Sequence, residues 1–214
     1  MTLLVIETGF AALSVALLDG NELVAEHHEL VGRGHAERLM PVIAALLAGH
    51  QPPLAVLVDA GPGSYTGLRI GIAAARALGL AWGVDVTATT STALLAAGAF
   101  ARDPALTSIT TVLDAGRGQV YAETIAADWR SDDAPRVTNP ADLTASLPHD
   151  AVLVGSGAAL AHAFDAFATV VGDFPRAADA RWLPLARRQR PPAPRYLEPT
   201  AYAQTPERSA PALA

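Results

Sequence analysis

Short apolar runs alternate with amphipathic stretches along the first half of the chain. Apolar runs of strand length end at glycine or acidic residues that favour turns, which is typical of buried strands. The run at 22–29 is polar at alternate positions, which is typical of a strand near the edge of a sheet. Strands are predicted over residues 3–6, 13–18, 22–29, 54–58 and 84–87. Apolar residues at helical spacing predict helices over residues 35–48, 66–82 and 91–102.

The start of the second half echoes the start of the first. Residues 109–113 and 119–125 read as a strand, a turn and a returning strand, and the acids Glu7 and Asp114 occupy matching places. Two short matches can arise by chance, but a duplicated beginning is typical of a two-lobed α/β fold. We therefore predict an N-terminal lobe over residues 1–103 and a smaller C-terminal lobe over 104–214.

Beyond these strands the pattern weakens. A strand over 152–154 and a helix over 158–167 are predicted, and the last residues read as a loose tail. No apolar stretch reaches the ~20 residues that a membrane span needs. Since the N-terminus also lacks a cationic leader, we expect a soluble cytoplasmic protein.

Charge and cysteine content exclude several classes of function. The formal net charge is −6, and the basic residues are scattered until Arg187 and Arg188, so no basic face for gripping a nucleic acid is predicted. Any RNA contact is expected through a partner. With no cysteine, the chain has no disulfide, no thiolate zinc site and no cysteine nucleophile.

The segment 61–69 is the first candidate for chemistry. It leaves a strand and opens a helix, where free N–H groups favour an anion, and Gly61, Gly63 and Ser64 form a candidate phosphate loop. Thr66 is the expected N-cap of the helix. The segment lacks the lysine of a Walker A loop, so a plain tight connection between strand and helix fits equally well.

Glu7 and Asp114 are the second candidate, because carboxylates at strand ends suit a hydrated Mg²⁺ beside nucleotide phosphates. The alternative, that both acids only cap turns, is the one we favour. The six histidines form no metal-ligand spacing, and Ser64 lacks the Gly-x-Ser-x-Gly elbow of a hydrolase nucleophile.

Three separated segments carry a family resemblance. Residues 32–41 (GRGHAERLMP), 61–71 (GPGSYTGLRIG) and 113–122 (LDAGRGQVYA) resemble the TsaB (YeaZ) family in order and spacing. The resemblance covers roughly the first 125 residues and returns only at a strand-like ending near 195–197. It implies an α/β, actin-like fold of two related lobes, as in sugar kinases and heat-shock chaperones.

The same resemblance implies a function. Members act as non-catalytic scaffold subunits in making threonylcarbamoyladenosine in tRNA, with a TsaD-like catalytic subunit and a TsaE-like ATPase. It implies no cofactor on this chain, with ATP and metal on the partner subunits. It further implies tRNA contact only through the complex, no membrane contact, and a homodimer when the chain is alone.

Two departures from the catalytic relative favour a scaffold over a catalyst. Where TsaD carries two metal-binding histidines, this chain has the stretch 89–95 (TTSTALL), without a histidine. Glu7 also stands where the family usually has Asp, which moves the carboxylate by one methylene. The rivals are a stand-alone ATP-dependent kinase or ATPase with this fold and, less favoured, a metallopeptidase.

We expect the helices over 35–48 and 66–82 to form the surface for the TsaD-like partner. The predicted interface residues are Leu39, Met40, Ile43, Leu47, Leu68, Ile72, Ala75 and Arg76. The alternative is that these apolar stripes belong to the core, as part of each must. On the interface interpretation, replacing Ile72 or Ala75 by a charged residue abolishes partner binding and leaves the fold intact.

Overall fold

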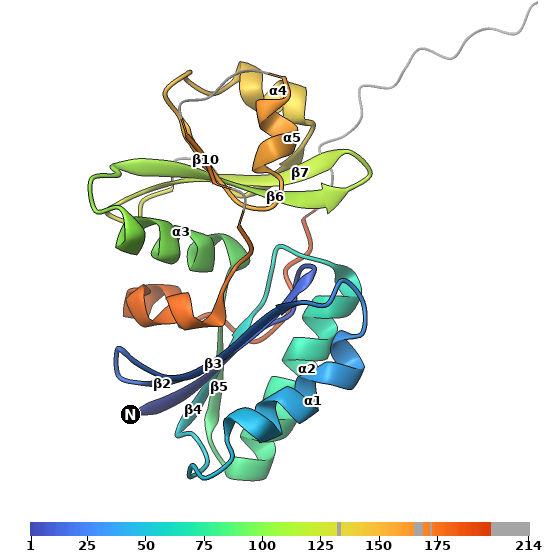
Figure 1. Cartoon of the computed structure of the whole chain (residues 1–214), viewed down its shortest axis with the longest axis vertical. Helices are drawn as coiled ribbons and strands as arrows, with labels where there is room; N and C mark the ends of the chain where they lie inside the picture. The colour runs from blue at the N-terminus through green and yellow to red at the C-terminus, as the bar shows by residue number, and fades with distance from the viewer. Residues whose placement is uncertain (132–133, 165–168, 172, 198–214) are drawn as a thin grey trace, which may run out of the picture.

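A computed structural model describes residues 1–131, 134–164, 169–171 and 173–197, and these residues form two five-stranded sheets with helices between and outside them (Figure 1). The elements up to the middle of the chain are β1 (Thr2–Glu7), β2 (Ala12–Asp19), β3 (Glu22–Leu30), α1 (His35–Leu46), β4 (Ala55–Asp59), α2 (Tyr65–Trp82), β5 (Asp85–Thr89) and α3 (Ser91–Arg102). Those that follow are β6 (Ser108–Gly116), β7 (Gln119–Ala126), β8 (Arg136–Thr138), α4 (Pro140–Ala145), β9 (Val152–Val154), α5 (Ala158–His162), β10 (Thr169–Val171) and the 3₁₀ helices η1 (Ala177–Trp182) and η2 (Leu185–Arg187).

The two sheets repeat one topology. The first has the order β3-β2-β1-β4-β5, and the second, read in the same direction, has the order β8-β7-β6-β9-β10. In both, three antiparallel strands are followed by two that run parallel to the first strand of the unit. The duplication predicted from two short segments therefore extends over whole sheets and confirms the two-lobed α/β fold.

Helices and sheets alternate in layers. α1 and α2 pack on one face of the first sheet, through Leu39, Ile43, Ile72 and Leu78 among others. α3 and η1 cover the opposite face of that sheet. The second sheet lies on the far side of α3, and α4 and α5 close its outer face (Figure 1).

Helix α3 explains much of the alanine in the chain. Residues 91–99 are all buried, because the helix has a sheet on each side. Small side chains let both layers approach closely. At Gly98 even a Cβ atom would lie 2.1 Å from a carboxylate oxygen of Asp179 in η1, so any larger residue there must displace that side chain.

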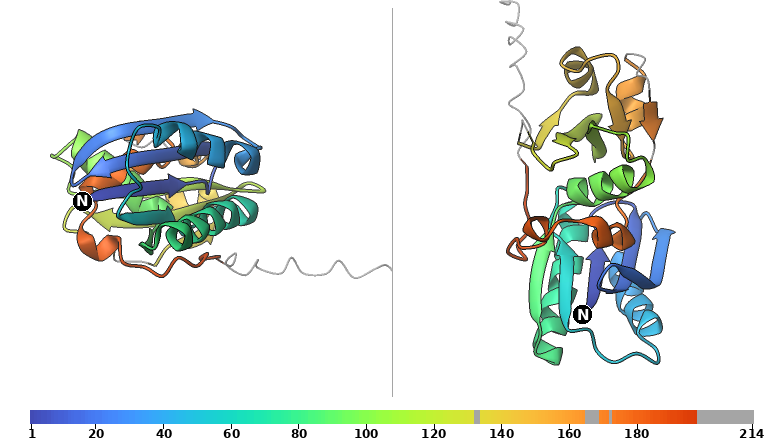
Figure 2. Two further views of the ribbon diagram at one scale, coloured as in Figure 1. Left: turned by 90° about the horizontal axis from the view of Figure 1, so that it is seen from below. Right: turned by 90° about the vertical axis from the view of Figure 1, so that its left-hand side faces the viewer.

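The chain returns to the first sheet after finishing the second. The backbone N–H of Ala177 donates to Ser14 Oγ at 2.9 Å, and Arg176 pairs with Glu26 at 2.9 Å. Further on, Arg190 forms a β-bridge with Ala88 of β5. These contacts place η1 against the first lobe, beside the N-terminus (Figure 2), although it follows the predicted boundary at 103/104. The division into lobes 1–103 and 104–214 itself stays a prediction.

Several local predictions differ from the structure. Ser64, not Thr66, is the N-cap of α2: its Oγ accepts the N–H of Gly67 at 3.0 Å. No strand forms at 195–197, where backbone contacts instead join the segment to the loop after β4. The helix predicted over 158–167 ends at His162, and residues 165–167 lie outside the described residues.

Candidate functional site

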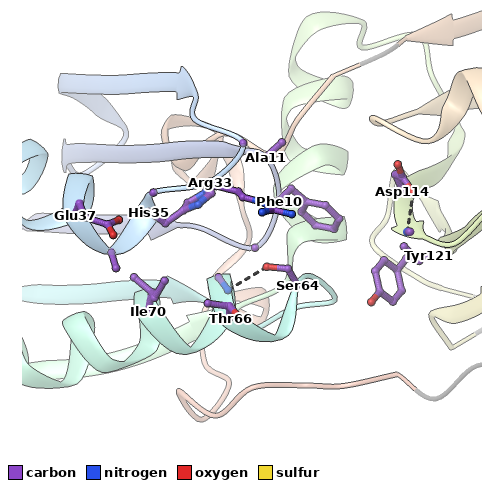
Figure 3. Close-up of a pocket in the computed structure, with 17 residues that line it drawn as sticks. Phe10, Ala11, Arg33, His35, Glu37, Ser64, Thr66, Ile70, Asp114 and Tyr121 are labelled. Atoms are coloured by element: carbon purple, nitrogen blue, oxygen red, sulfur yellow. Dashed lines mark hydrogen bonds between the residues drawn. The ribbon is translucent and has the colours of Figure 1, made fainter.

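A cleft of about 680 Å³ opens where the two lobes meet (Figure 3). The loop after β1, the loop before α1 and the start of α2 form one side, and the turn between β6 and β7 forms the other. Phe10 and Tyr121 meet across it edge to face, with ring centroids 6.3 Å apart. The side chains that line it include Phe10, Arg33, His35, Glu37, Ser64, Thr66, Ile70, Asp114 and Tyr121.

The glycine loop is fastened to the loop after β1. The N–H of Ser64 donates to the carbonyl of Gly9 at 2.7 Å, and Thr8 Oγ1 donates to the carbonyl of Gly67 at 2.8 Å. A Cβ atom at Gly63 would lie 2.8 Å from the backbone carbonyl oxygen of Gly9. A Cβ atom at Gly67 would lie 2.0 Å from the backbone carbonyl oxygen of Thr8. These glycines are therefore required for close backbone packing, whatever the cleft binds.

The entry to α1 forms another wall of the cleft. Gly34 has a φ of 100°, which glycine adopts without strain, and the helix begins at His35. Nε2 of His35 lies 3.2 Å from the carbonyl oxygen of Ala12 and is buried. Arg33 and Glu37 on either side remain exposed, so this wall presents both charges.

Two carboxyl groups lie together beneath the cleft floor. β1 and β4 run parallel with Ile6 opposite Val58, so Glu7 and Asp59 end neighbouring strands. Both are buried, and a Cβ atom at Gly9 would lie 3.1 Å from Glu7 Oε1 and 2.7 Å from Asp59 Oδ2. Glu7 Oε2 is enclosed and has no hydrogen-bond partner among the described residues. Neither side chain of the pair lines the cleft.

Burial changes the ionisation of both acids. It raises the pKa of Asp59 to about 7, although N–H and O–H donors from Gly61 and Ser91 act in the opposite direction. Burial, followed by repulsion from the Asp59 charge, also raises the pKa of Glu7 well above its ordinary value. Two neighbouring carboxyl groups without a cation therefore favour holding a proton.

The hydroxyl of Ser91 supports a protonated Asp59 on geometric grounds. Ser91 Oγ lies 2.8 Å from Asp59 Oδ2 and 2.6 Å from the carbonyl oxygen of Pro62. A serine hydroxyl has one proton, so it can donate to only one of these two acceptors. When Asp59 is protonated, it donates to Ser91, and Ser91 donates to Pro62. Both contacts are then hydrogen bonds.

The predicted phosphate-site residues are divided by the structure. Ser64 and Asp114 line the cleft, whereas Glu7, Gly61 and Gly63 do not. Asp114 is exposed, and its Oδ1 accepts the N–H of Gly116 at 2.7 Å, as Glu7 Oε1 accepts the N–H of Gly9 at 2.7 Å. Both acids thus cap turns. A phosphate role for Ser64 and Asp114 stays a prediction.

The predicted partner surface needs correction. Five of its eight residues are buried in the core of the first lobe: Leu39, Ile43, Leu68, Ile72 and Ala75. Their side chains cannot reach a partner in this conformation, because Leu39, Ile43, Ile72 and Ala75 fill the space between α1, α2 and the sheet, and Leu68 is fully buried beside Gly9 and Gly61. Met40 and Arg76 are exposed, and Leu47 is partly so.

Asp59 and Ser91 are the site residues that sequence reasoning missed, although a signal for Asp59 was present. Residues 59–61 and 114–116 both read Asp-Ala-Gly, and Glu7 likewise precedes Gly9.

Among the described residues, no group of three or more His, Cys, Asp or Glu side chains could hold a metal ion. None of the described helices is long and apolar enough to cross a membrane.

Comparison with known proteins gives the relationships of the chain. The family model of TsaD, tRNA N6-adenosine threonylcarbamoyltransferase, matches residues 26–171. The tRNA threonylcarbamoyladenosine biosynthesis protein TsaB of Escherichia coli is 31% identical over 168 residues, which are 73% of this chain and 72% of that protein. TsaB of Bacillus subtilis is 36% identical over 125 residues, 56% of this chain and about half (53%) of that relative.

A solved structure agrees with these relatives. YeaZ from Pseudomonas aeruginosa superimposes with a TM-score of 0.73 at 29% identity, covering 83% of this chain and 87% of that one. The shared region includes both lobes, since neither accounts for 83% of the chain. The two-sheet architecture is thus the actin-like fold that the sequence predicts.

Proposed function

The chain belongs to the TsaB family, whose curated members are named for tRNA threonylcarbamoyladenosine biosynthesis, and we propose that it serves that pathway as a non-catalytic scaffold. In this role it binds a TsaD-like catalytic subunit and a TsaE-like ATPase in the cytoplasm. ATP and metal belong to those partners, and this chain needs no cofactor of its own. Without its partners, the chain pairs with a second copy of itself.

The observation that carries the proposal is the inward orientation of Glu7. An acid at the end of β1 is the group that would hold a metal beside nucleotide phosphates in an actin-like cleft. Here it is buried against Asp59 and caps the turn at Gly9. Neither Glu7 nor Asp59 lines the cleft, and Glu7 Oε1 already accepts the N–H of Gly9, so this pair is not presented to a ligand in the cleft.

The start of α3 supports the same conclusion. At the positions where, by resemblance, TsaD carries its histidines, three of the four hydroxyl groups have internal partners, and Thr89 Oγ1 is buried without a partner among the described residues. Thr90 Oγ1 accepts the N–H of Ala93 at 3.1 Å, and Thr92 Oγ1 donates to Glu123 Oε2 at 2.6 Å. Ser91 contacts Asp59 and Pro62. These side chains stabilise the joint between α3 and the two sheets.

The outer faces of α1 and α2 are the surface we assign to the TsaD-like partner. On α2 the exposed positions Ala73, Arg76, Ala77 and Leu80 follow one helical stripe, and Leu80 is 86% exposed. On α1, Met40 is 45% exposed. The small side chains of Ala73 and Ala77 let a partner helix approach closely, and the two large apolar side chains, Leu80 and Met40, add apolar contact area. The core residues behind them hold the two helices in place.

Reconstitution of tRNA modification tests the proposal. The TsaD-like and TsaE-like partners from the same organism are assayed for threonylcarbamoyladenosine formation with and without this chain. We expect the rate to fall to near background without it and to recover when the chain is added. A full rate in its absence would refute the scaffold role.

The cleft itself favours one alternative, a stand-alone ATP-dependent kinase or ATPase. Its volume and the N-terminus of α2 at its wall suit a phosphate group. That function predicts ATP binding and phosphate release by the purified chain alone. Calorimetry with ATP and Mg²⁺ decides between the two, because the scaffold proposal predicts no turnover without partners.

A further inference from the structure

A second pocket, of about 690 Å³, lies at the opposite end of β1 from the cleft. The chain's first residues, the turn between β2 and β3, Trp129 and the residues from the end of η1 to η2 surround it. Figure 2 shows η1 beside the N-terminus. Its main side chains are Leu3, Trp129, Arg181, Trp182 and Arg188. Apart from Trp129, all lie outside residues 26–171, so the family match does not account for the pocket.

The segment that forms one side of this pocket is rich in arginine, and two of its arginines, Arg181 and Arg188, line the pocket, whereas Arg190 and Arg195 lie beside Ala60 and Thr90. Residues 181–197 contain five arginines, at 181, 187, 188, 190 and 195, and no Asp or Glu, whereas the whole chain has a net charge of −6. Among the residues that the structure describes, no carboxylate lies within 4.0 Å of these five guanidinium groups. The two arginines that line the pocket, Arg181 and Arg188, therefore have no carboxylate partner among the described residues.

Two tryptophans accompany the arginines. The guanidinium of Arg181 lies 4.0 Å from the ring centroid of Trp182, which remains 41% exposed. Arg187 lies 5.8 Å from the ring of Trp129 and donates to the backbone carbonyl of that residue. An arginine stacked on tryptophan has reduced freedom, so its charge is held in place before a ligand arrives.

Arg188 fixes the loop that carries this arrangement. Its Nε donates to the carbonyl of Leu183 at 3.0 Å, and its terminal nitrogen donates to the carbonyl of Arg181 at 3.2 Å. Half-buried as it is, the guanidinium stays charged, since arginine does not lose its proton in proteins. The loop between η1 and η2 is thus a built structure that places cations and an indole ring around one space.

We propose that this pocket binds a nucleotide unit, with the base stacked against Trp182 and the phosphate at Arg181 and Arg188. A planar ring beside fixed guanidinium groups matches the two chemical parts of a nucleotide. A volume near 690 Å³ is within the range of small-ligand sites. The same chemistry is offered by a free mononucleotide and by one residue of an RNA strand.

The proposal changes the expectation that RNA reaches this chain only through its partners. That expectation rests on the net charge, which averages over a chain whose cations are unevenly placed. The pocket is remote from the outer faces of α1 and α2, because η1 and those helices cover opposite faces of the first sheet. A partner bound on α1 and α2 therefore leaves the pocket open to a nucleotide.

Fluorescence anisotropy of a fluorescein-labelled single-stranded hexaribonucleotide tests the pocket with the purified full chain at low salt. We expect saturable binding that weakens about tenfold in Trp182→Ala, the magnitude associated with loss of one base stack. Arg181→Ala should weaken binding similarly and reduce its dependence on salt. Arg117→Ala, at the exposed turn between β6 and β7, removes the same charge elsewhere and should leave binding unchanged.

Competition identifies the source of the nucleotide. Displacement by AMP assigns the pocket to free nucleotides, and displacement by unlabelled RNA alone assigns it to an RNA strand; both results support the proposal. Absence of binding, or equal binding by the wild type and a well-folded Trp182→Ala variant, overturns it. Displacement by inorganic polyphosphate with no effect of Trp182→Ala likewise overturns it, because charge alone would then suffice. If Arg181→Ala fails to fold, Arg181→Lys replaces it in the binding assay, because lysine retains the charge.

Discussion

Glu7 and Asp59 end adjacent parallel strands, and each buried carboxyl group accepts the N–H of the glycine two residues further on, at 2.7 Å and 3.0 Å. The same turn recurs exposed at Asp114, in the second lobe. One local design therefore occurs in two environments. In the second lobe its acid lines the cleft, and in the first lobe its acid belongs to the core.

The first prediction concerns Asp59→Asn. Because the pKa of Asp59 in the folded state is raised to about 7, the folded chain holds a proton that the unfolded chain releases. The stability of the wild type should therefore fall as pH rises from about 4 to about 7, by at most about 1.4 kcal/mol per pH unit for this group. Asparagine donates to Ser91 and accepts from Gly61 at every pH, so the variant should lose this dependence. Urea unfolding of both proteins between pH 5 and 9 measures how the free energy of unfolding depends on pH.

A matching result would be a stability difference between Asp59→Asn and wild type that grows up to about pH 7 and then stays constant. Glu7→Gln provides the comparison, since the pKa of Glu7 is raised as well. If Asp59→Asn is less stable than wild type at pH 9, the protonated arrangement at Ser91 is incorrect.

The second prediction concerns the cap of α2. Ser64→Ala removes the oxygen that accepts the N–H of Gly67, and should lower the free energy of unfolding by about 1 kcal/mol. Thr66→Ala, two residues away and exposed, should change it by less than about 0.5 kcal/mol. Urea denaturation of both variants decides which residue is the cap, and equal losses would contradict the assignment.

The third prediction separates core from surface on α2. Ile72→Arg puts an unpaired charge among apolar side chains, and should cost more than about 3 kcal/mol or prevent folding. Leu80→Arg, eight residues later on the exposed face, should change stability by less than about 0.5 kcal/mol and abolish co-purification with the TsaD-like partner. Co-purification of a folded Leu80→Arg variant at the wild-type level would remove this face from the proposed interface.

The fourth prediction concerns Gly98 in α3. Alanine normally stabilises a helix interior relative to glycine by about 1 kcal/mol. Here the new Cβ would lie 2.1 Å from Asp179 Oδ2, so we expect a net loss of about 1–2 kcal/mol in thermal or urea unfolding. In an Asp179→Ala background the cost should shrink, because the obstructing carboxylate is gone. Equal costs in both backgrounds would show that the close contact is unimportant.

Much of the first lobe is predictable from the sequence, because its strands and helices are long and strongly periodic. The predicted helix 91–102 agrees with α3 at both ends, and the duplicated acid–glycine turn indicated the second sheet. The three-residue strands β8 and β10 escaped prediction, because they have too few residues to show a period, and they lack the wholly apolar run ending at glycine by which β9, of the same length, was predicted. Pairing with longer neighbours determines their structure.

The candidate site was predictable only in part, since periodicity identifies an apolar stripe without showing what lies opposite it. Ile72 and Leu80 both follow the helical pattern of α2, yet one faces the sheet and the other faces solvent. The cluster of Asp59 and Ser91 joins residues 32 positions apart. The pocket at Trp182 likewise depends on a segment that returns to the N-terminus, and no local signal predicts that return.

That return has a consequence for how the molecule is made. Val5, Ala16, Leu18 and Leu57 of the first sheet pack against Ala177, Ala180 and Leu183, which are synthesised after the whole second sheet. A ribosome-bound chain that ends before η1 therefore carries a first sheet with one apolar face only partly covered. The lobe that begins first is completed last, and a nascent chain paused within the second lobe should be a better substrate for chaperones than the finished protein.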